Sequence, residues 1–165
     1  MKKSTITKIL ITSFLLMISG MGYAMSRFNL CLFSEVEGIV LDHGKPVVGA
    51  ELERIWELSY NESRGSDKTI TDEKGYFYLP KITKFFVLPG ILPFMQPSVG
   101  QDIFIHDKGR NIEAWRSSKR DYKVNSELGK PIRLICHIDK EPVYTEIPNK
   151  LNRSVFGVCE FVDNL

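Results

Sequence analysis

A catalytic or metal-binding site in this sequence would depend on its histidines, its cysteines or a series of alternating glutamates. The histidines are His43, His106 and His137. A catalytic triad needs a nucleophile, a base and an orienting group that meet in space, and the sequence has no Gly-x-Ser-x-Gly nucleophile motif. It also has no Cys-x-x-Cys or His-x-x-x-His spacing. We therefore predict no catalytic, metal or other cofactor site.

Glu51, Glu53 and Glu57 follow the two-residue repeat of one predicted strand. Side chains at alternate positions of a strand point to the same face. The spacing therefore indicates a solvated face rather than a pair of carboxylates that share an acid–base task.

The cysteines are Cys31, Cys136 and Cys159. In an oxidising compartment, three cysteines indicate one disulfide and one free thiol. Cys136–Cys159 is the first choice, because it closes a loop of about 24 residues, worth roughly 3 kcal/mol in the chain-entropy account of disulfides. The two pairings that involve Cys31 stay open.

Residues 1–24 have the three parts of a secretory signal peptide. Three lysines precede an apolar run of 13 positions, Ile9–Met21, and Gly22-Tyr23-Ala24 places small residues before a cleavage site. A membrane-spanning helix needs about 20 apolar residues, so we expect cleavage after Ala24 and no integral span in residues 25–165. An uncleaved anchor is the open alternative. The predicted location is periplasmic or secreted.

The net charge and composition restrict the classes of partner that we expect. Without the three lysines of residues 1–24, the chain has 19 basic and 20 acidic residues, a formal charge of −1. Nucleic-acid binding, which depends on basic surfaces, is therefore not expected. The segment Trp115–Lys123 mixes four cations with two aromatic side chains. We interpret it as a solvated loop or a partner-facing patch.

Alternating apolar residues and turn residues predict a single all-β sandwich in residues 25–165. Arg54 interrupts the apolar face of the strand predicted over 51–58, which suggests a bulge or an open strand end. Residues 60–68 are expected to form a loop. Two hairpins are expected, with turns at 72–75 and 107–110. The predicted strands cover residues 35–42, 51–58, 69–71, 76–79, 103–106, 112–116, 132–136 and 155–162.

One pattern resembles a known family. The stretch from Glu37-Gly38-Ile39-Val40-Leu41-Asp42 through Lys45-Pro46-Val47-Val48-Gly49-Ala50, followed by Thr71-Asp72-Glu73-Lys74-Gly75-Tyr76-Phe77-Tyr78-Leu79, resembles the carboxypeptidase regulatory-like, or transthyretin-like, domain. Cys31–Gly38 and Lys130–Leu134 resemble a bacterial family of uncharacterised exported domains. The resemblance implies a prealbumin-like Greek-key sandwich of about seven strands. Such modules mostly act as binding domains or as spacers between other domains.

The enzymes among the transthyretin-like proteins hydrolyse hydroxyisourate and end in Tyr-Arg-Gly-Ser. In this chain Ser63-Arg64-Gly65-Ser66 is internal, falls in the predicted loop and lacks the tyrosine. The sequence therefore does not support assigning hydroxyisourate hydrolysis to this chain.

An apolar loop insertion is predicted over residues 85–95, where Pro89, Gly90 and Pro93 exclude a regular central strand. One interpretation is a connection that buries its own side chains over the end of the sandwich. The other is an exposed anchor for a partner protein. Its candidate partner-binding residues are Phe85, Phe86, Leu88, Ile91, Leu92, Phe94 and Met95.

These features together predict a non-enzymatic, exported binding module of the bacterial periplasm. Its partner would be another protein, such as a secreted toxin or an envelope protein, so that the chain acts as an immunity protein or inhibitor. The alternative is an envelope-assembly or carbohydrate-binding accessory domain. A transthyretin-type hydrolase is less favoured.

Overall fold

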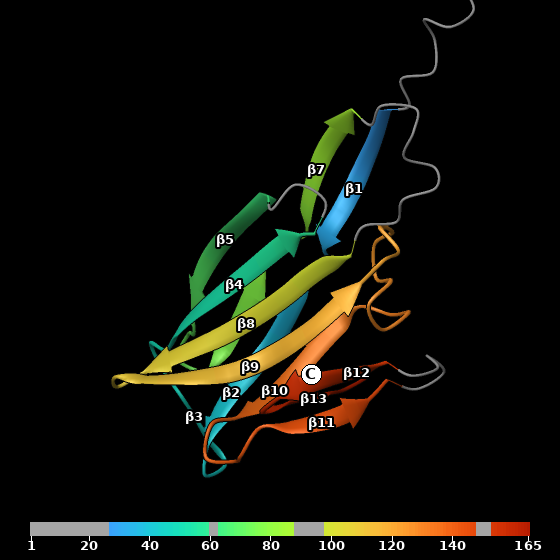
Figure 1. The fold of residues 1–165 in the computed structure, drawn as a ribbon. Coiled ribbons are helices and arrows are strands. Elements are labelled where there is room, and N and C mark those ends of the chain that lie inside the picture. Colours follow the sequence, from blue (N-terminus) through green and yellow to red (C-terminus); the bar gives the residue numbers. More distant parts are fainter. Residues whose placement is uncertain (1–26, 60–62, 88–97, 148–152) are drawn as a thin grey trace, which may run out of the picture. The chain divides into compact units, whose positions relative to one another are not determined.

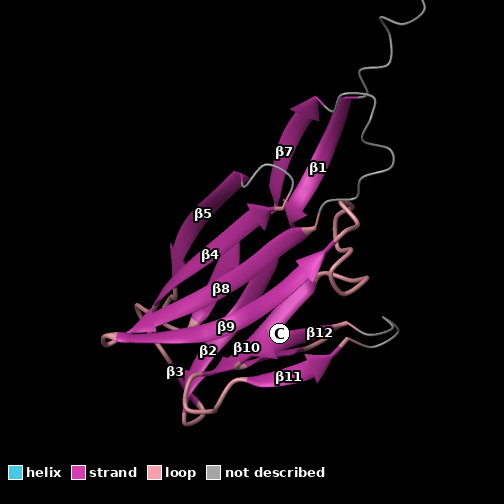
Figure 2. Cartoon of the chain, in the orientation of Figure 1, coloured by secondary structure: helices cyan, strands magenta, loops and turns pink. Residues whose placement is uncertain are grey.

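Strands dominate the computed structural model of the protein (Figures 1 and 2). The structure describes residues 27–59, 63–87, 98–147 and 153–165. No helix in these ranges is long and apolar enough to cross a membrane. The chain divides into two compact units, Met1–Asn29 with Phe85–Gln96, and Leu30–Lys84 with Pro97–Leu165. The second unit contains the sandwich, so the predicted all-β sandwich is confirmed.

One layer of the sandwich is a five-stranded sheet ordered β13-β10-β2-β3, in which β6 also pairs with β2. β10 runs parallel to β2, and the other pairs are antiparallel. Its strands are β2 (Val36–Asp42), β3 (Lys45–Pro46), β6 (Tyr76–Leu79), β10 (Ile132–His137) and β13 (Cys159–Phe161). A separate two-stranded sheet pairs β1 (Arg27–Phe33) with β7 (Ile82–Val87).

The other layer is a six-stranded sheet ordered β11-β12-β9-β8-β4-β5. The hairpin predicted at 107–110 is confirmed: β8 and β9 are joined by Lys108 and Gly109, whose φ values of 47° and 79° match the type I′ turn of two-residue hairpins. The strands are β4 (Glu51–Leu58), β5 (Ser63–Ile70), β8 (Val99–Asp107), β9 (Arg110–Lys119), β11 (Val143–Glu146) and β12 (Ser154–Gly157).

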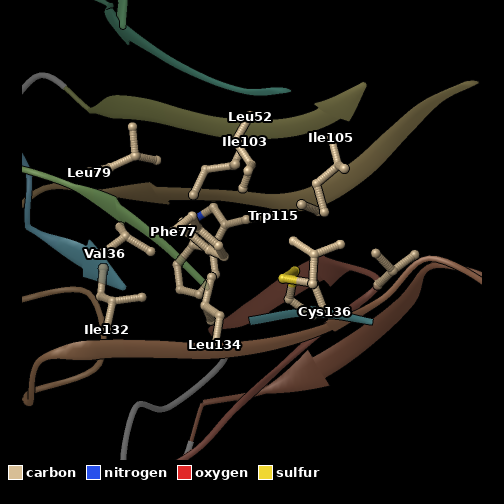
Figure 3. Packing of buried hydrophobic residues seen from close by; sticks show 14 of the residues in the cluster. Val36, Leu52, Phe77, Leu79, Ile103, Ile105, Trp115, Ile132, Leu134 and Cys136 are labelled. Carbon is tan, nitrogen blue, oxygen red and sulfur yellow. A yellow bond between two sulfur atoms is a disulfide. The ribbon is translucent and has the colours of Figure 1, made fainter. Parts of the chain in front are cut away.

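The hydrophobic core lies between these two sheets because their central strands bury alternate side chains. In β2, β4, β8 and β10 every second residue is buried, as expected for strands with one covered face. Figure 3 shows side chains of the two sheets facing one another, with Trp115 at the centre. The labelled residues are Val36, Leu52, Phe77, Leu79, Ile103, Ile105, Trp115, Ile132, Leu134 and Cys136.

A disulfide joins Cys136 and Cys159 in this core. The two residues are directly opposite in the antiparallel pair β10–β13. The third cysteine, Cys31, is a buried free thiol. The first-choice pairing is therefore confirmed, and the disulfide fixes the last strand of the sheet to its neighbour.

Loss of this disulfide is expected to lower the free energy of unfolding by about 3 kcal/mol, because the unfolded chain regains the entropy of a loop with a sequence separation of 23 residues. The measurement is a urea titration with and without reductant. The Cys31→Ala variant should keep the reductant-dependent shift, whereas the double variant Cys136→Ala/Cys159→Ala should lose it. An equal shift in both would contradict the assignment.

Two sequence predictions about local structure are wrong. Residues 63–68 form most of β5 instead of a loop, and all eight β5 residues pair with β4. The turn at 72–75 does not join a hairpin, because β5 pairs with β4 in one sheet whereas β6 pairs with β2 in the other. The turn itself forms as expected, since Asp72 Oδ1 accepts hydrogen bonds from the backbone N–H groups of Lys74 and Tyr76, at 2.8 and 2.9 Å.

The single strand predicted over 155–162 is also wrong. The chain changes sheets at Gly157 and Val158, so that β12 pairs with β9 and β11 whereas β13 pairs with β10. Apolar alternation continues on both sides of the change, which is why the sequence pattern resembles one strand.

Candidate binding face

The outer face of the five-stranded sheet carries a group of aromatic and charged side chains. β2, β6 and β10 bury one set of alternate residues in the core and present the other set outward. The strand register aligns Tyr78, Glu37 and Arg133 in one row across the three strands. The next row aligns Tyr76, Ile39 and Ile135. We call these six residues the tyrosine–arginine face.

Two glutamates hold the polar groups of this face in place. Arg133 Nε donates to Glu37 Oε1 at 2.7 Å, and the Tyr76 hydroxyl donates to Glu37 Oε2 at 3.1 Å. The Tyr78 hydroxyl donates to Glu35 Oε2 at 3.2 Å. Desolvation raises the pKa of both tyrosines, and the neighbouring carboxylates raise it further. Both hydroxyls therefore stay protonated at neutral pH and act as hydrogen-bond donors.

An open cleft of about 590 Å³ lies on this face. One wall is the turn that Asp72 organises, and another is the chain after β13. There, Val162 N donates to Arg133 O, and the Arg133 guanidinium donates to Asp163 O at 2.9 Å. The Lys130 ammonium, hydrogen bonded to Asp163, lowers the pKa of that carboxyl. The lining residues are Glu37, Ile39, Asp72, Lys74, Tyr76, Arg133, Asn164 and Leu165.

This arrangement suits binding, because aromatic surface lies beside fixed donors and acceptors of both charges. Tyrosine and arginine are enriched among the residues that dominate protein interfaces. The described residues contain no group of three His, Cys, Asp or Glu side chains that can hold a metal ion. His43 contacts Asp42 at 2.7 Å, and His106 lies 3.5 Å from Glu53. Each of these two histidines thus has a carboxylate neighbour at the surface.

A comparison of the sequence with known protein families identifies the family of this chain. Residues 36–141 match the family described as Domain of unknown function (DUF6795). The chain belongs to this family. No curated protein and no solved structure matches the chain. The matched region contains all six residues of the tyrosine–arginine face and Cys136, and it ends before Cys159. The resemblance to carboxypeptidase regulatory-like domains is not tested by this match and stays a prediction.

The DUF6795 region also holds a buried polar cluster that the sequence did not predict. The interpretation of Trp115–Lys123 as a solvated loop is wrong for residues 115–119, because β9 continues to Lys119 and the side chains of Trp115 and Lys119 are only 0 % and 1 % exposed. Residues 120–123 follow β9 as a mostly exposed loop, as predicted. Lys119 Nζ lies 2.8 Å from Glu127 Oε1, and both side chains are fully buried. An inward-facing lysine at the end of an apolar strand is the signal that could have revealed this pair.

Glu127 is the centre of this cluster. Its Oε1 atom also accepts from Ser34 N at 3.0 Å and from Gln101 Nε2 at 2.9 Å, and its Oε2 atom accepts from Ser34 Oγ at 2.7 Å. Burial alone would raise the pKa of Glu127. The charge of Lys119 and the hydrogen bonds from Lys119, Ser34 and Gln101 outweigh burial, so the pKa is lowered and the carboxylate is ionised.

Arg54 forms a second buried cluster, and the prediction of a bulge or an open strand end there is wrong. β4 stays in regular register with both of its neighbours through Arg54. Its guanidinium is fully buried and donates twice to the carboxylate of Asp67, the residue opposite on β5. It also donates to Ser34 O and Pro80 O and lies 5.0 Å from the centre of the Phe33 ring. The charge is accommodated by partners instead of by a distorted strand.

The partner-binding segment predicted from the sequence is only partly within the described residues. Phe85 to Val87 complete β7, so the predicted loop insertion begins later than residue 85. The Phe85 side chain is 56 % exposed. The remaining predicted anchors, Leu88, Ile91, Leu92, Phe94 and Met95, lie outside the described residues.

Proposed function

We propose that this DUF6795 protein is a non-enzymatic binding module of the bacterial periplasm, and that it acts as an immunity protein or inhibitor by binding another protein. The tyrosine–arginine face carries this proposal. The predicted signal peptide and the Cys136–Cys159 disulfide support the compartment, because disulfides persist in oxidising environments.

The face has the physical properties of a preorganised interface. Its side chains extend from the regular strands of one sheet, and Glu35 and Glu37 fix the tyrosine hydroxyls and the Arg133 guanidinium before any partner arrives. Side chains that are already ordered lose less conformational entropy on binding. Tyr78 is 45 % exposed, so it can contribute aromatic area to a partner.

The exposed Phe85 is a candidate second anchor, as expected from the apolar segment that it begins. A few aromatic or aliphatic anchors dominate the energy of most interfaces.

We expect Tyr78→Ala to weaken partner binding by about 10- to 100-fold, the effect of removing an interface anchor worth roughly 1.4–2.8 kcal/mol. The mature chain is immobilised and exposed to periplasmic extract, the retained protein is identified, and its Kd is measured by titration. The matched control is Tyr144→Ala, which removes a 76 % exposed tyrosine from β11 of the other sheet. Its Kd should stay within about twofold of the wild type.

Equal Kd values for both variants and the wild type would exclude the tyrosine–arginine face as the interface. Retention of a polysaccharide in place of a protein would instead favour the carbohydrate-binding alternative. The free energy of unfolding of Tyr78→Ala, measured in parallel, separates lost binding from lost folding.

A further inference from the structure

The buried side chains of Gln101 and Lys119 both donate a hydrogen bond to one carboxylate oxygen of buried Glu127. Gln101 is on β8, Lys119 is the last residue of β9, and Glu127 lies between β9 and β10. Their exposed fractions are 0 %, 1 % and 0 %. Lys119 Nζ lies 2.8 Å and Gln101 Nε2 lies 2.9 Å from the same Glu127 Oε1. An amine, a carboxamide and a carboxylate are therefore held together in a site without water access. We call these three residues the amine–amide site.

The amide group of Gln101 is oriented by its two nitrogen donors. Nε2 donates to Leu32 O at 2.8 Å and to Glu127 Oε1. The carbonyl oxygen Oε1 is buried and has no hydrogen-bond partner among the described residues. An unpartnered buried carbonyl is a costly feature in a native structure and calls for an explanation.

The Lys119 ammonium is also incompletely paired. It has three N–H donors, but within the described residues its only hydrogen-bond partner besides Glu127 is the Lys123 carbonyl oxygen at 3.5 Å. An ion pair in a low-dielectric interior is favourable only when its remaining hydrogen-bonding groups are satisfied. The site thus holds an incompletely paired amine and an amide whose carbonyl oxygen lacks a donor, and the amine and the amide nitrogen both contact Glu127 Oε1.

We propose that the amine–amide site forms an intramolecular isopeptide bond between Lys119 and Gln101. Lys119 passes one proton to Glu127 and becomes a neutral amine. Nζ then forms a bond to Gln101 Cδ, and the bond from Cδ to Nε2 breaks. Glu127 gives its proton to the departing Nε2, which leaves as ammonia, and takes a further proton from Nζ, so that Glu127 ends protonated. Atoms and charge balance, and no oxidant or cofactor is needed.

The position of Glu127 gives it the role of proton relay, because its Oε1 atom contacts both the attacking and the leaving nitrogen. General acid–base catalysis requires a group within hydrogen-bond reach of both. The backbone N–H and hydroxyl of Ser34 hold that carboxylate in place. A desolvated lysine is an activated nucleophile once it is neutral.

The strand register makes the bond geometrically accessible. Gln101 is opposite Ser117, and Lys119 is opposite Val99, so the two residues are diagonal neighbours on adjacent antiparallel strands. Diagonal pairs lie about 7–8 Å apart, within reach of long side chains. Holding the two groups in one site supplies a high effective concentration. The bond would link β8 to the end of β9 and remove a buried ion pair.

The test is peptide mapping by mass spectrometry of the full chain, expressed with its own N-terminal segment and purified from the periplasmic fraction. We expect one linked peptide pair that contains residues 101 and 119, lighter than the sum of its parts by about 17 Da, the mass of the ammonia lost. Trypsin should not cleave after Lys119. Lys119→Arg and Glu127→Gln should each restore the full mass, and the control Lys123→Arg should keep the loss.

Full-mass, separate peptides from the wild-type chain would overturn the proposal, and this result depends on no variant folding. A loss of about 18 Da would indicate an amide between Lys119 and Glu127 instead, because water and not ammonia would leave. A 17 Da loss with normal tryptic cleavage after Lys119 would point to another nucleophile. Both results would overturn the assignment to Lys119 and Gln101. Binding by the tyrosine–arginine face is measured separately, so neither result bears on it.

Discussion

Replacing Arg54 with alanine is expected to lower the free energy of unfolding by about 3–5 kcal/mol, the usual cost of removing one partner of a buried ion pair. The Arg54 side chain is fully buried and donates to Asp67 and to the carbonyl oxygens of Ser34 and Pro80. Its removal leaves the carbonyl groups of Ser34 and Pro80 without this donor and deprives the Asp67 carboxylate, which is 33 % exposed, of its guanidinium partner. Urea titration followed by tryptophan fluorescence measures the loss.

Arg116→Ala is the matched control for this prediction. Arg116 is also an arginine of the six-stranded sheet with two carboxylate neighbours, Asp102 and Glu113. Its side chain is 58 % exposed, and exposed ion pairs contribute about 0–1 kcal/mol because water screens them. A similar loss of stability in both variants would show that burial does not set the importance of Arg54.

Features that depend on neighbours in sequence were predictable. Alternation of apolar residues identified the strands that contain Val36, Leu52, Ile103 and Ile132, because a strand with one buried face repeats every two residues. The turn at Lys108 and Gly109 was also predictable, since glycine permits the positive φ that a tight hairpin needs.

The buried polar residues were harder to interpret because their partners are distant. Arg54 and Lys119 occupy inward positions of apolar strands, and the sequence shows that they break the pattern. It does not show that Asp67 lies opposite Arg54, or that Glu127 lies within hydrogen-bond distance of Lys119. An inward polar residue has two physical solutions, a distorted strand or a buried partner, and only the fold reveals which one applies.

The tyrosine–arginine face was beyond sequence reasoning for a similar reason. The outward positions of Glu37, Tyr78 and Arg133 follow from alternation within each strand. Their alignment depends on the parallel pairing of β2 with β10 and on the pairing of β2 with β6. These pairings join segments far apart in the chain, and no local propensity specifies them.

The change of sheet at Gly157 leads to the second large expected effect. Gly157→Ala should lower the free energy of unfolding by about 3 kcal/mol or more, because overpacking against rigid groups forces backbone shifts. A Cβ atom at Gly157 would lie 2.1 Å from the Ala114 carbonyl oxygen and 2.5 Å from its carbon. These are backbone atoms of β9, and they cannot move aside as a flexible side chain can.

Gly100→Ala is the control that separates this crowding from the general effect of removing a glycine. A Cβ atom at Gly100 would approach no other atom closer than 3.8 Å. The substitution also reduces the freedom of the unfolded chain, so stability should be unchanged or rise by up to about 1 kcal/mol. Thermal unfolding of both variants provides the measurement. Gly157 has a φ of 153° and is the last residue of β12, which pairs with β9. Equal melting temperatures for Gly157→Ala and Gly100→Ala would contradict the close approach of Gly157 to the β9 backbone.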